Sequence, residues 1–285
     1  SERALGEALE GTPRDAYFLS TKAGYLPMGD GVTDEHPRDW FHRVLLGPGV
    51  LTPEGLVEGI HCLSPGYLRH QLSVSLEALR VEVVDVFHLH NPEHARPRLG
   101  PRRFEEVMRE AFRTCEALVE EGRIRAYGVA TWSGFRVGPD RPDHLSLEAL
   151  LRLAEEAGGK AHHFQWVQVP LNLGMPEALL EPTQVSGGRR ISLLQAARNA
   201  KLKVQASAAM LQARILPQVA EQLGPFRELF PGCETPAQVA LQFTASAPGV
   251  TTALCGMGQV AHVEANAPVL KLPPVPPGEL ARLFA

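Results

Sequence analysis

The chain has 285 residues, of which 44% are hydrophobic and 21% are charged, and its formal net charge is -4. This is the composition of a globular protein with a large core, and α/β barrels of this length form one domain. Basic residues are scattered, and no apolar run approaches the length of a membrane span, which argues against nucleic-acid and membrane partners. Four cysteines without a CxxC pair are expected as free thiols of a cytoplasmic protein: Cys62, Cys115, Cys233 and Cys255.

Short β-branched or aromatic runs alternate along the chain with longer segments of helical period. Ser64 is a typical N-cap and Pro65 a typical first helical residue, and four leucines follow at helical spacing. Gly122 ends a second apolar-periodic helix. Strands are expected over 16–22, 83–90, 126–131, 165–169, 203–207 and 250–255, and helices over 65–79, 104–119, 145–158, 191–200, 235–246 and 259–267.

Strand–helix alternation predicts a parallel sheet with helical crossovers. No G-x-G-x-x-G follows any strand, which argues against an open doubly wound sheet. The sequence therefore favours an α/β fold, a (β/α)8 TIM barrel forming one domain over 1–285, with six of eight strand–helix units visible. Residues 25–60 hold no clear element beyond a possible short helix after Pro53 and are expected as a long loop. In barrels such loops build the active site.

Two residues that end strands are candidates for chemistry. Lys22 closes the first run and His90 closes the second. Taken alone, the lysine is typical of a solvated loop and the histidine of a structural role. Together at one barrel mouth they indicate a proton-handling site, because histidine titrates near neutrality and a lysine lowers the pKa of a neighbour.

Several segments resemble one family in the same order along nearly the whole chain. Ser20 to Gly24 resembles a strand that carries an active-site lysine, and 75–79 with 84–92 resembles a helix followed by a strand that ends in a catalytic histidine. Tyr127 to Trp132 resembles a fifth strand, 167–172 a sixth, and 250–266 an eighth with the start of a cofactor-binding helix. The family is the aldo-keto reductases, (β/α)8-barrel oxidoreductases that use a nicotinamide cofactor.

The resemblance implies a reaction and a set of site residues. Hydride passes between NAD(P)H and an aldehyde or ketone while a tyrosine donates the proton. Lys22 would lower the pKa of that tyrosine, and His90 would orient the small-molecule carbonyl substrate. NADPH is the expected cofactor, with NADH possible, and its contacts are expected at Thr131, Gln168, Ser207, Gly256, His262 and Asn266.

The sequence also departs from the family. Residues 1–9 resemble the helix after the family's Tyr-Gly motif, so the tyrosine, the aspartate and two strands are expected before Ser1. A polypeptide that begins at Ser1 is expected not to catalyse carbonyl reduction, unless a residue such as Tyr25 or His90 donates the proton. Ala130-Thr131 replaces the usual Ser-Asn pair, and 205–208 lacks the aromatic residue that stacks on nicotinamide.

His262 stands where an arginine often holds the 2′-phosphate of NADPH, so weak discrimination between the two cofactors is expected. Two other functions stay open. The chain could be a regulatory subunit that binds the cofactor without turnover. His88 and His90 share a face and could form the metal pair of a barrel hydrolase, which needs further ligands that Thr131, Gln168 and Ser207 do not supply. His61, Cys62 and His70 match no recognised metal-site spacing.

Overall fold

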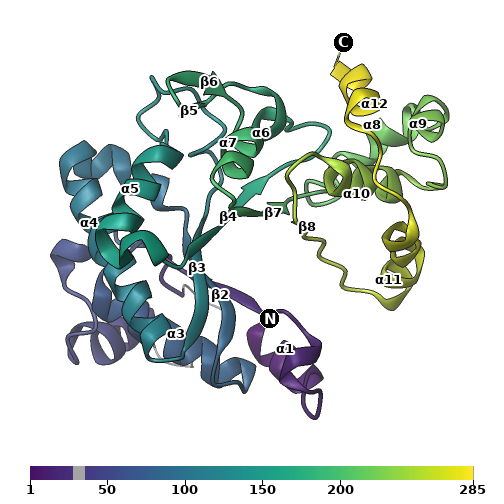
Figure 1. Ribbon diagram of the computed structural model, residues 1–285. Coiled ribbons are helices and arrows are strands. Elements are labelled where there is room, and N and C mark those ends of the chain that lie inside the picture. Colours follow the sequence, from purple (N-terminus) through teal and green to yellow (C-terminus); the bar gives the residue numbers. More distant parts are fainter. Residues whose placement is uncertain (28–35, 285) are drawn as a thin grey trace. The chain divides into compact units, whose positions relative to one another are not determined.

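A computed structural model describes residues 1–27 and 36–284, so 28–35 of the expected 25–60 loop lie outside the described residues. The chain forms two compact units (Figure 1). Unit 1 is Ser1–Gly134 with Glu148–Trp166, and unit 2 is Phe135–Leu147 with Val167–Ala285.

Unit 1 holds three strands and the start of a fourth. The strands are β1 (Ser20–Ala23), β2 (Val84–His90), β3 (Ile124–Ala130) and β4 (Phe164–Pro170). The helices are α1 (Glu2–Ala8), α2 (Pro37–Phe41), α3 (Pro65–Leu79), α4 (Arg96–Glu120) and α5 (Leu147–Gly158), with short turns of helix at Arg14–Ala16, His42–Leu46, Pro53–Gly55, Pro92–His94 and Gly159–Ala161.

Unit 2 holds the rest of β4 and most of the later elements. Its strands are β5 (Gln184–Ser186), β6 (Arg189–Ile191), β7 (Lys203–Ser207) and β8 (Thr252–Ala253). Its helices are α6 (Glu177–Leu180), α7 (Leu193–Asn199), α8 (Leu216–Glu221), α9 (Leu223–Leu229), α10 (Pro236–Ser246), α11 (Val260–Asn266) and α12 (Pro277–Ala281), with 3-10 turns at Ala267–Lys271 and Arg282–Phe284.

Six strands form one sheet in the order β1-β2-β3-β4-β7-β8, and β5 pairs separately with β6. The pairings β1–β2, β2–β3 and β7–β8 are parallel, while β5–β6 is antiparallel. Helices connect the successive parallel strands, with α3 between β1 and β2 and α4 between β2 and β3. The strand–helix architecture predicted from the sequence is confirmed.

Both ends of α3 and the end of α4 lie where the sequence indicates. The Ser64 hydroxyl accepts a hydrogen bond from the Tyr67 amide at the start of α3, and Arg80 ends that helix in the left-handed region at φ 56°. Gly122, at φ 71°, ends α4. All four predicted leucines of α3 are buried: Leu68, Leu72, Leu76 and Leu79.

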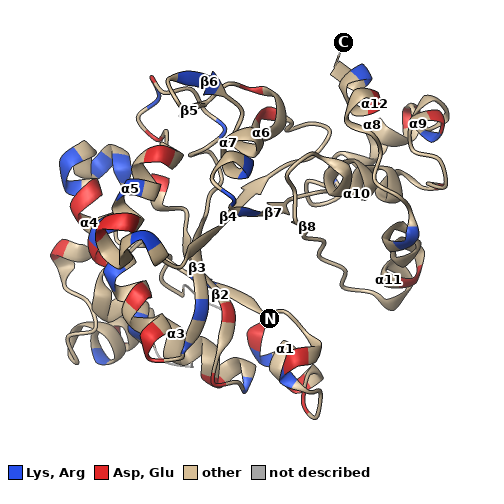
Figure 2. Cartoon of the chain, viewed as in Figure 1, with Lys and Arg blue, Asp and Glu red and all other residues tan. Residues whose placement is uncertain are grey.

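Charges of both signs cover the exposed faces of α4 and α5 (Figure 2). Arg152 of α5 contacts Glu105 at 2.9 Å and Glu156 at 2.6 Å, and Arg109 contacts Glu156 at 2.7 Å. These exposed pairs belong to a solvated surface and stabilise little individually.

The prediction for residues 25–60 was wrong in part, although the expected short helix after Pro53 is present as Pro53–Gly55. Short helical elements lie at Pro37–Phe41 and His42–Leu46. Leu45 is buried there in a cluster with Cys62 and Tyr67. Each element is about one turn long, and the pair lies between Pro37 and Gly47, so the segment is too short for a helical period to mark it in the sequence.

Other boundaries also differ. The expected strand 250–255 is only Thr252–Ala253, and α4 begins at Arg96 with a break at Gly100, where φ is 71°. The β5–β6 hairpin was missed, although Gly187-Gly188, both at positive φ, is a typical two-residue hairpin turn.

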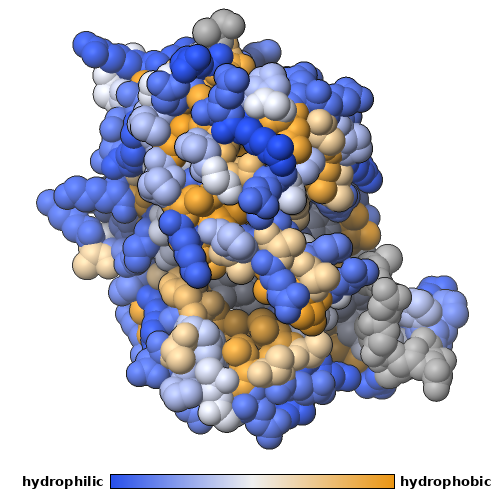
Figure 3. Space-filling model, turned by 90° about the vertical axis from the view of Figure 1, so that its right-hand side faces the viewer, coloured by the Kyte–Doolittle hydropathy of each residue, from blue (hydrophilic) through white to orange (hydrophobic). Residues whose placement is uncertain are grey.

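Apolar side chains reach the surface of unit 2, and orange apolar atoms are visible among polar ones in the space-filling view (Figure 3). No helix among the described residues is long and apolar enough to cross a membrane. The exposed large apolar residues of unit 2 are Leu180, Val185, Leu254, Met257, Val260, Val263, Leu270 and Phe284.

Candidate functional site

Lys22 and His90 lie at the same end of two paired parallel strands. In the β1–β2 register Lys22 is opposite His88, and His90 follows two residues further along β2. Because side chains alternate along a strand, these three side chains share one face. The structure thus places Lys22 and His90 at the carboxyl ends of their paired strands, where β/α proteins have their sites.

The His90 imidazole is electrically neutral at neutral pH. Burial lowers its pKa to about 4, with further lowering by the positive charge of Lys22 and by His61. Lys22 itself is exposed. A neutral imidazole beside a fixed positive charge can donate or accept a hydrogen bond at an oxygen that gains negative charge.

His61 supports the backbone of His90 and was not predicted as part of this site. It is fully buried, and its Nε2 lies 2.8 Å from the His90 carbonyl oxygen. Because a carbonyl only accepts, Nε2 carries the hydrogen and donates it. Burial lowers the pKa of His61 to about 4, although the bond to His90 acts in the opposite direction.

Gly24 allows this close approach. A Cβ at Gly24 would lie 2.5 Å from the His90 carbonyl oxygen and 3.0 Å from Nε2 of His61. The Cys62 amide donates to the Gly24 carbonyl at 2.7 Å. Glycine is therefore required at this position for the two segments to meet behind His90.

Tyr25 lies in the middle of three imidazoles. Its ring centroid is 5.0 Å from those of His61 and His90 and 5.7 Å from that of His94, each in an edge-on arrangement. The sequence predicts Tyr25 only as a substitute proton donor, and it gives no prediction for His94. A sequence signal was present, since Tyr25 follows Lys22 by three residues and His94 follows His90 by four.

Glu93 fixes the loop that follows β3. It is buried, and its Oε1 accepts from the amides of Trp132 at 2.6 Å and Ser133 at 3.1 Å. Burial raises the pKa of Glu93, against the effect of these amides. The loop carries Thr131, an expected cofactor contact, which is buried, and Trp132, which is 51% exposed.

In unit 2, three of the predicted cofactor-binding residues line one pocket. Gly256, His262 and Asn266 surround it together with Ala208 and Met257. Asn266 is 7% exposed, its amide nitrogen is 3.6 Å from the Met257 sulfur, and its Oδ1 has no hydrogen-bond partner among the described residues. An unsatisfied buried acceptor beside a pocket fits a ligand that donates a hydrogen bond.

The remaining predicted residues lie elsewhere. Gln168 is on β4 and Ser207 ends β7, outside the residues that line this pocket. Thr131 belongs to unit 1 together with Lys22 and His90. The expected site residues are therefore divided between the two units.

A metal centre was the alternative interpretation of His88 and His90. Over residues 1–27 and 36–284, no group of three or more His, Cys, Asp or Glu side chains is arranged to hold a metal ion. Nε2 of His61 is engaged by the His90 carbonyl, which makes it unavailable as a ligand.

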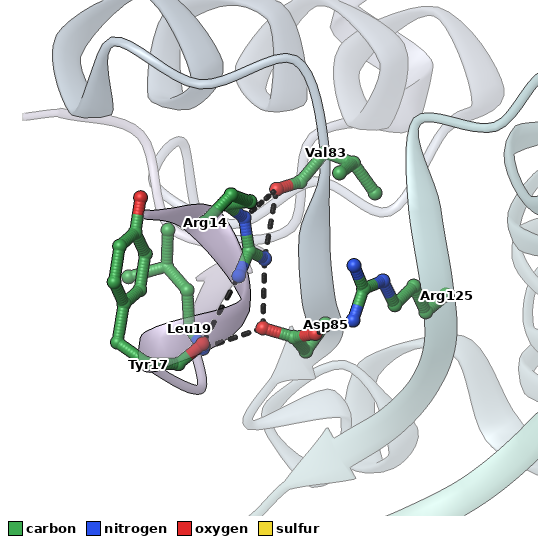
Figure 4. Close-up of polar contacts among 6 residues, drawn as sticks. All are labelled: Arg14, Tyr17, Leu19, Val83, Asp85 and Arg125. Atoms are coloured by element: carbon green, nitrogen blue, oxygen red, sulfur yellow. Dashed lines mark hydrogen bonds and ion pairs between the residues drawn. The ribbon is translucent and has the colours of Figure 1, made fainter. Parts of the chain in front are cut away.

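The opposite end of β2 carries ion pairs around a buried carboxylate (Figure 4). Asp85 is 4% exposed and accepts from Arg14 at 2.7 Å, Arg125 at 2.8 Å and the Leu19 amide at 2.7 Å. Arg14 also donates to the Val83 carbonyl at 3.0 Å. Both oxygens of the Asp85 carboxylate are thus paired within the protein, as in a structural ion pair.

The chain is similar to aldo-keto reductases in part of its sequence. Residues 1–137 match the model of the Aldo/keto reductase family. Aldo-keto reductase family 7 member A3 of Homo sapiens is 33% identical over 75 residues, which are 26% of this chain and 20% of the human protein. The match thus spans about a fifth of that relative's length.

Two longer matches cover nearly the whole chain. A Schizosaccharomyces pombe protein named as a voltage-gated potassium channel subunit beta is 22% identical over 293 residues, which cover 93% of this chain and 70% of that protein. The structure of an aldo-keto reductase from Bacillus halodurans in its holo form has a TM-score of 0.62 at 18% identity, covering 99% of this chain and 76% of that chain. At this identity the structural likeness shows the fold.

Proposed function

We propose that the chain is a member of the aldo/keto reductase family, whose model matches residues 1–137, and that it reduces a small aldehyde or ketone to an alcohol with a nicotinamide cofactor. The observation that carries the proposal is the meeting of Lys22 and His90 at the carboxyl ends of β1 and β2. A bound NADPH or NADH would supply the hydride.

The residues of unit 1 would act on the carbonyl oxygen. The neutral His90 imidazole donates a hydrogen bond to that oxygen and orients it. The positive charge of Lys22 stabilises negative charge that develops there, or lowers the pKa of a proton donor beside it. His61 holds the His90 backbone through the 2.8 Å bond, and Glu93 holds the neighbouring loop.

The cofactor would be held mainly by unit 2. Gly256, His262 and Asn266 line one pocket, where the unpartnered Oδ1 of Asn266 suits a donor such as an adenine amino group. Contacts nearer the nicotinamide are proposed at Thr131, Gln168 and Ser207. NADPH is the proposed cofactor and NADH a possible substitute.

Because His262 takes the place of a phosphate-binding arginine, the two cofactors should bind with free energies within about 1–3 kcal/mol of each other. Fluorescence titration with NADPH and with NADH measures this difference. A preference for NADPH of many thousandfold contradicts the proposed role of His262, and binding of neither cofactor contradicts the proposed function.

The reductase proposal is tested by turnover. Protein expressed from its whole coding region should oxidise NADPH or NADH in the presence of benzaldehyde, and Lys22→Met should lower kcat/KM by about 10²-fold or more. Lys160→Met removes an exposed lysine far along the sequence and serves as the matched control. Equal rates for the two lysine variants would contradict the proposed role of Lys22.

A second candidate is a cofactor-binding regulatory subunit, supported by the likeness to the potassium channel subunit over 93% of the chain. It predicts tight dinucleotide binding without carbonyl reduction. We also propose a cytoplasmic location, supported by the four free cysteines.

A further inference from the structure

Tyr25 is held in place more firmly than an ordinary loop residue. The hydroxyl of Tyr67 donates to the Tyr25 carbonyl at 2.6 Å, and Tyr67 is itself fully buried. Tyr25 also forms an antiparallel bridge with His61, and the next amide, that of Leu26, donates to the Ile60 carbonyl at 2.8 Å. The backbone at Tyr25 is thus fixed from both sides before any ligand binds.

The phenol ring is fixed as well. Its edge-on contacts with His61, His90 and His94 leave it half-buried, and its hydroxyl oxygen accepts from the Asn91 amide nitrogen at 3.4 Å. Since the oxygen is the acceptor in this bond, the hydroxyl hydrogen remains available. Among the described residues, no acceptor takes that hydrogen. The available donor therefore stands beside the imidazole proposed to bind the carbonyl.

We propose that Tyr25 determines substrate specificity by donating a hydrogen bond to an oxygen on the carbon next to the reacting carbonyl. The inference rests on the proposed function, in which His90 binds the carbonyl oxygen itself. A substrate with two adjacent oxygens satisfies both donors, whereas a simple aldehyde leaves the Tyr25 hydroxyl without its acceptor. A site built to hydrogen-bond a substrate oxygen discriminates against an analogue that lacks it. The preferred class is α-oxygenated aldehydes and ketones.

The test compares phenylglyoxal, which has a second oxygen next to its aldehyde, with benzaldehyde, which has none. We expect Tyr25→Phe to lower kcat/KM for phenylglyoxal about tenfold more than for benzaldehyde, as expected for one hydrogen bond. Comparing wild type and variant on each substrate cancels the hydration of phenylglyoxal. Tyr17→Phe removes a phenol hydroxyl before β1, beside Arg14, and should leave both values unchanged.

The outcomes separate the inference from the proposed function. A wild type that reduces both aldehydes, with a Tyr25→Phe variant that slows both equally, overturns the inference alone. A wild type that reduces neither aldehyde overturns the proposed function and the inference together. Should Tyr25→Phe unfold, Asn91→Asp offers a second variant, because it replaces the donor at the Tyr25 oxygen with an acceptor for the hydroxyl hydrogen. It should weaken the preference for phenylglyoxal, and an unaltered preference overturns the inference.

Discussion

The polar groups at the two ends of β2 differ in how far their hydrogen bonds are made within the protein. At the start of the strand, the Asp85 carboxylate is enclosed by Arg14, Arg125 and the Leu19 amide (Figure 4). At the other end, His90 is half-buried and neutral, and the Tyr25 hydroxyl beside it keeps its hydrogen available. One seven-residue strand therefore carries a carboxylate whose hydrogen bonds are made within the protein at its start, and groups that can still form a hydrogen bond with a ligand at its end.

The difference shows how position in the fold separates stability from function. The donors around Asp85 are already paired, so a ligand there would have to displace protein contacts. The groups around His90 are fixed in space but keep hydrogen-bonding capacity for a ligand. Substitutions at the two ends should therefore change different quantities.

The largest effect is expected for His90→Gln. Loss of the group that orients the carbonyl should lower kcat/KM for benzaldehyde by about 10²–10⁴-fold, while the free energy of unfolding changes little. Steady-state kinetics with urea denaturation of the same samples checks both quantities. His70→Gln on α3 is the control. If unfolding alone accounted for the loss of activity in His90→Gln, the claim that the two ends of β2 differ in function would be contradicted.

The next effect concerns pH. The pKa of His61 falls from 6.5 to about 4 on folding, so between these values the unfolded state binds more protons. The contribution of His61 to the free energy of unfolding should therefore be complete above pH 6.5, and about 3 kcal/mol of stability should be lost through this residue as pH drops towards 4. His61→Gln should flatten this part of the urea-denaturation profile. The exposed control His42→Gln should retain the wild-type slope, and equal slopes in all three proteins would contradict the buried neutral state.

A smaller change in the free energy of unfolding is expected at the start of β2, where Asp85 lies. Asp85→Asn removes the charge that two arginines contact and should lower the free energy of unfolding by about 2 kcal/mol. Folded protein should keep its kcat/KM, which urea denaturation and kinetics would show. Asp140→Asn, at an exposed carboxylate, is the matched control. An activity loss without destabilisation would assign Asp85 a functional role.

The smallest effect is electrostatic. Lys22→Met removes one of the causes that lower the pKa of His90, so that pKa should rise. It should stay below 6.5, because burial is the larger cause and remains. An NMR titration of the His90 ring measures the shift. A pKa that stays constant or falls would mean that Lys22 does not act on His90.

The long periodic elements could be predicted from the sequence. Strand 203–207 was predicted with the bounds of β7, and the leucines of α3 face the core as their spacing indicates. Such patterns repeat over several residues and agree with local capping signals. The segment that holds Trp40 and Leu45 could not be predicted, because its one-turn helices are stabilised by packing against Leu26 and Tyr67 rather than by their own period.

The site could be predicted only in part, for the same reason. Lys22 and His90 end strands, which is a local signal with a known meaning in β/α folds. His61 lies 29 residues before His90 in an irregular segment, and only the folded backbone brings its imidazole to the His90 carbonyl. The roles of Tyr25 and His94 depend on the same long-range contact.

Transfer of an isotopic label tests the central claim most directly. NADPH in which deuterium replaces both hydrogens on C4 of the nicotinamide is incubated with benzaldehyde and the protein. The benzyl alcohol that forms is analysed by mass spectrometry. Hydride transfer at the site predicts one deuterium in each alcohol molecule, with formation slowed in His90→Gln and not in His70→Gln. Tight binding of the dinucleotide without any labelled alcohol would contradict the reductase function and favour the regulatory subunit.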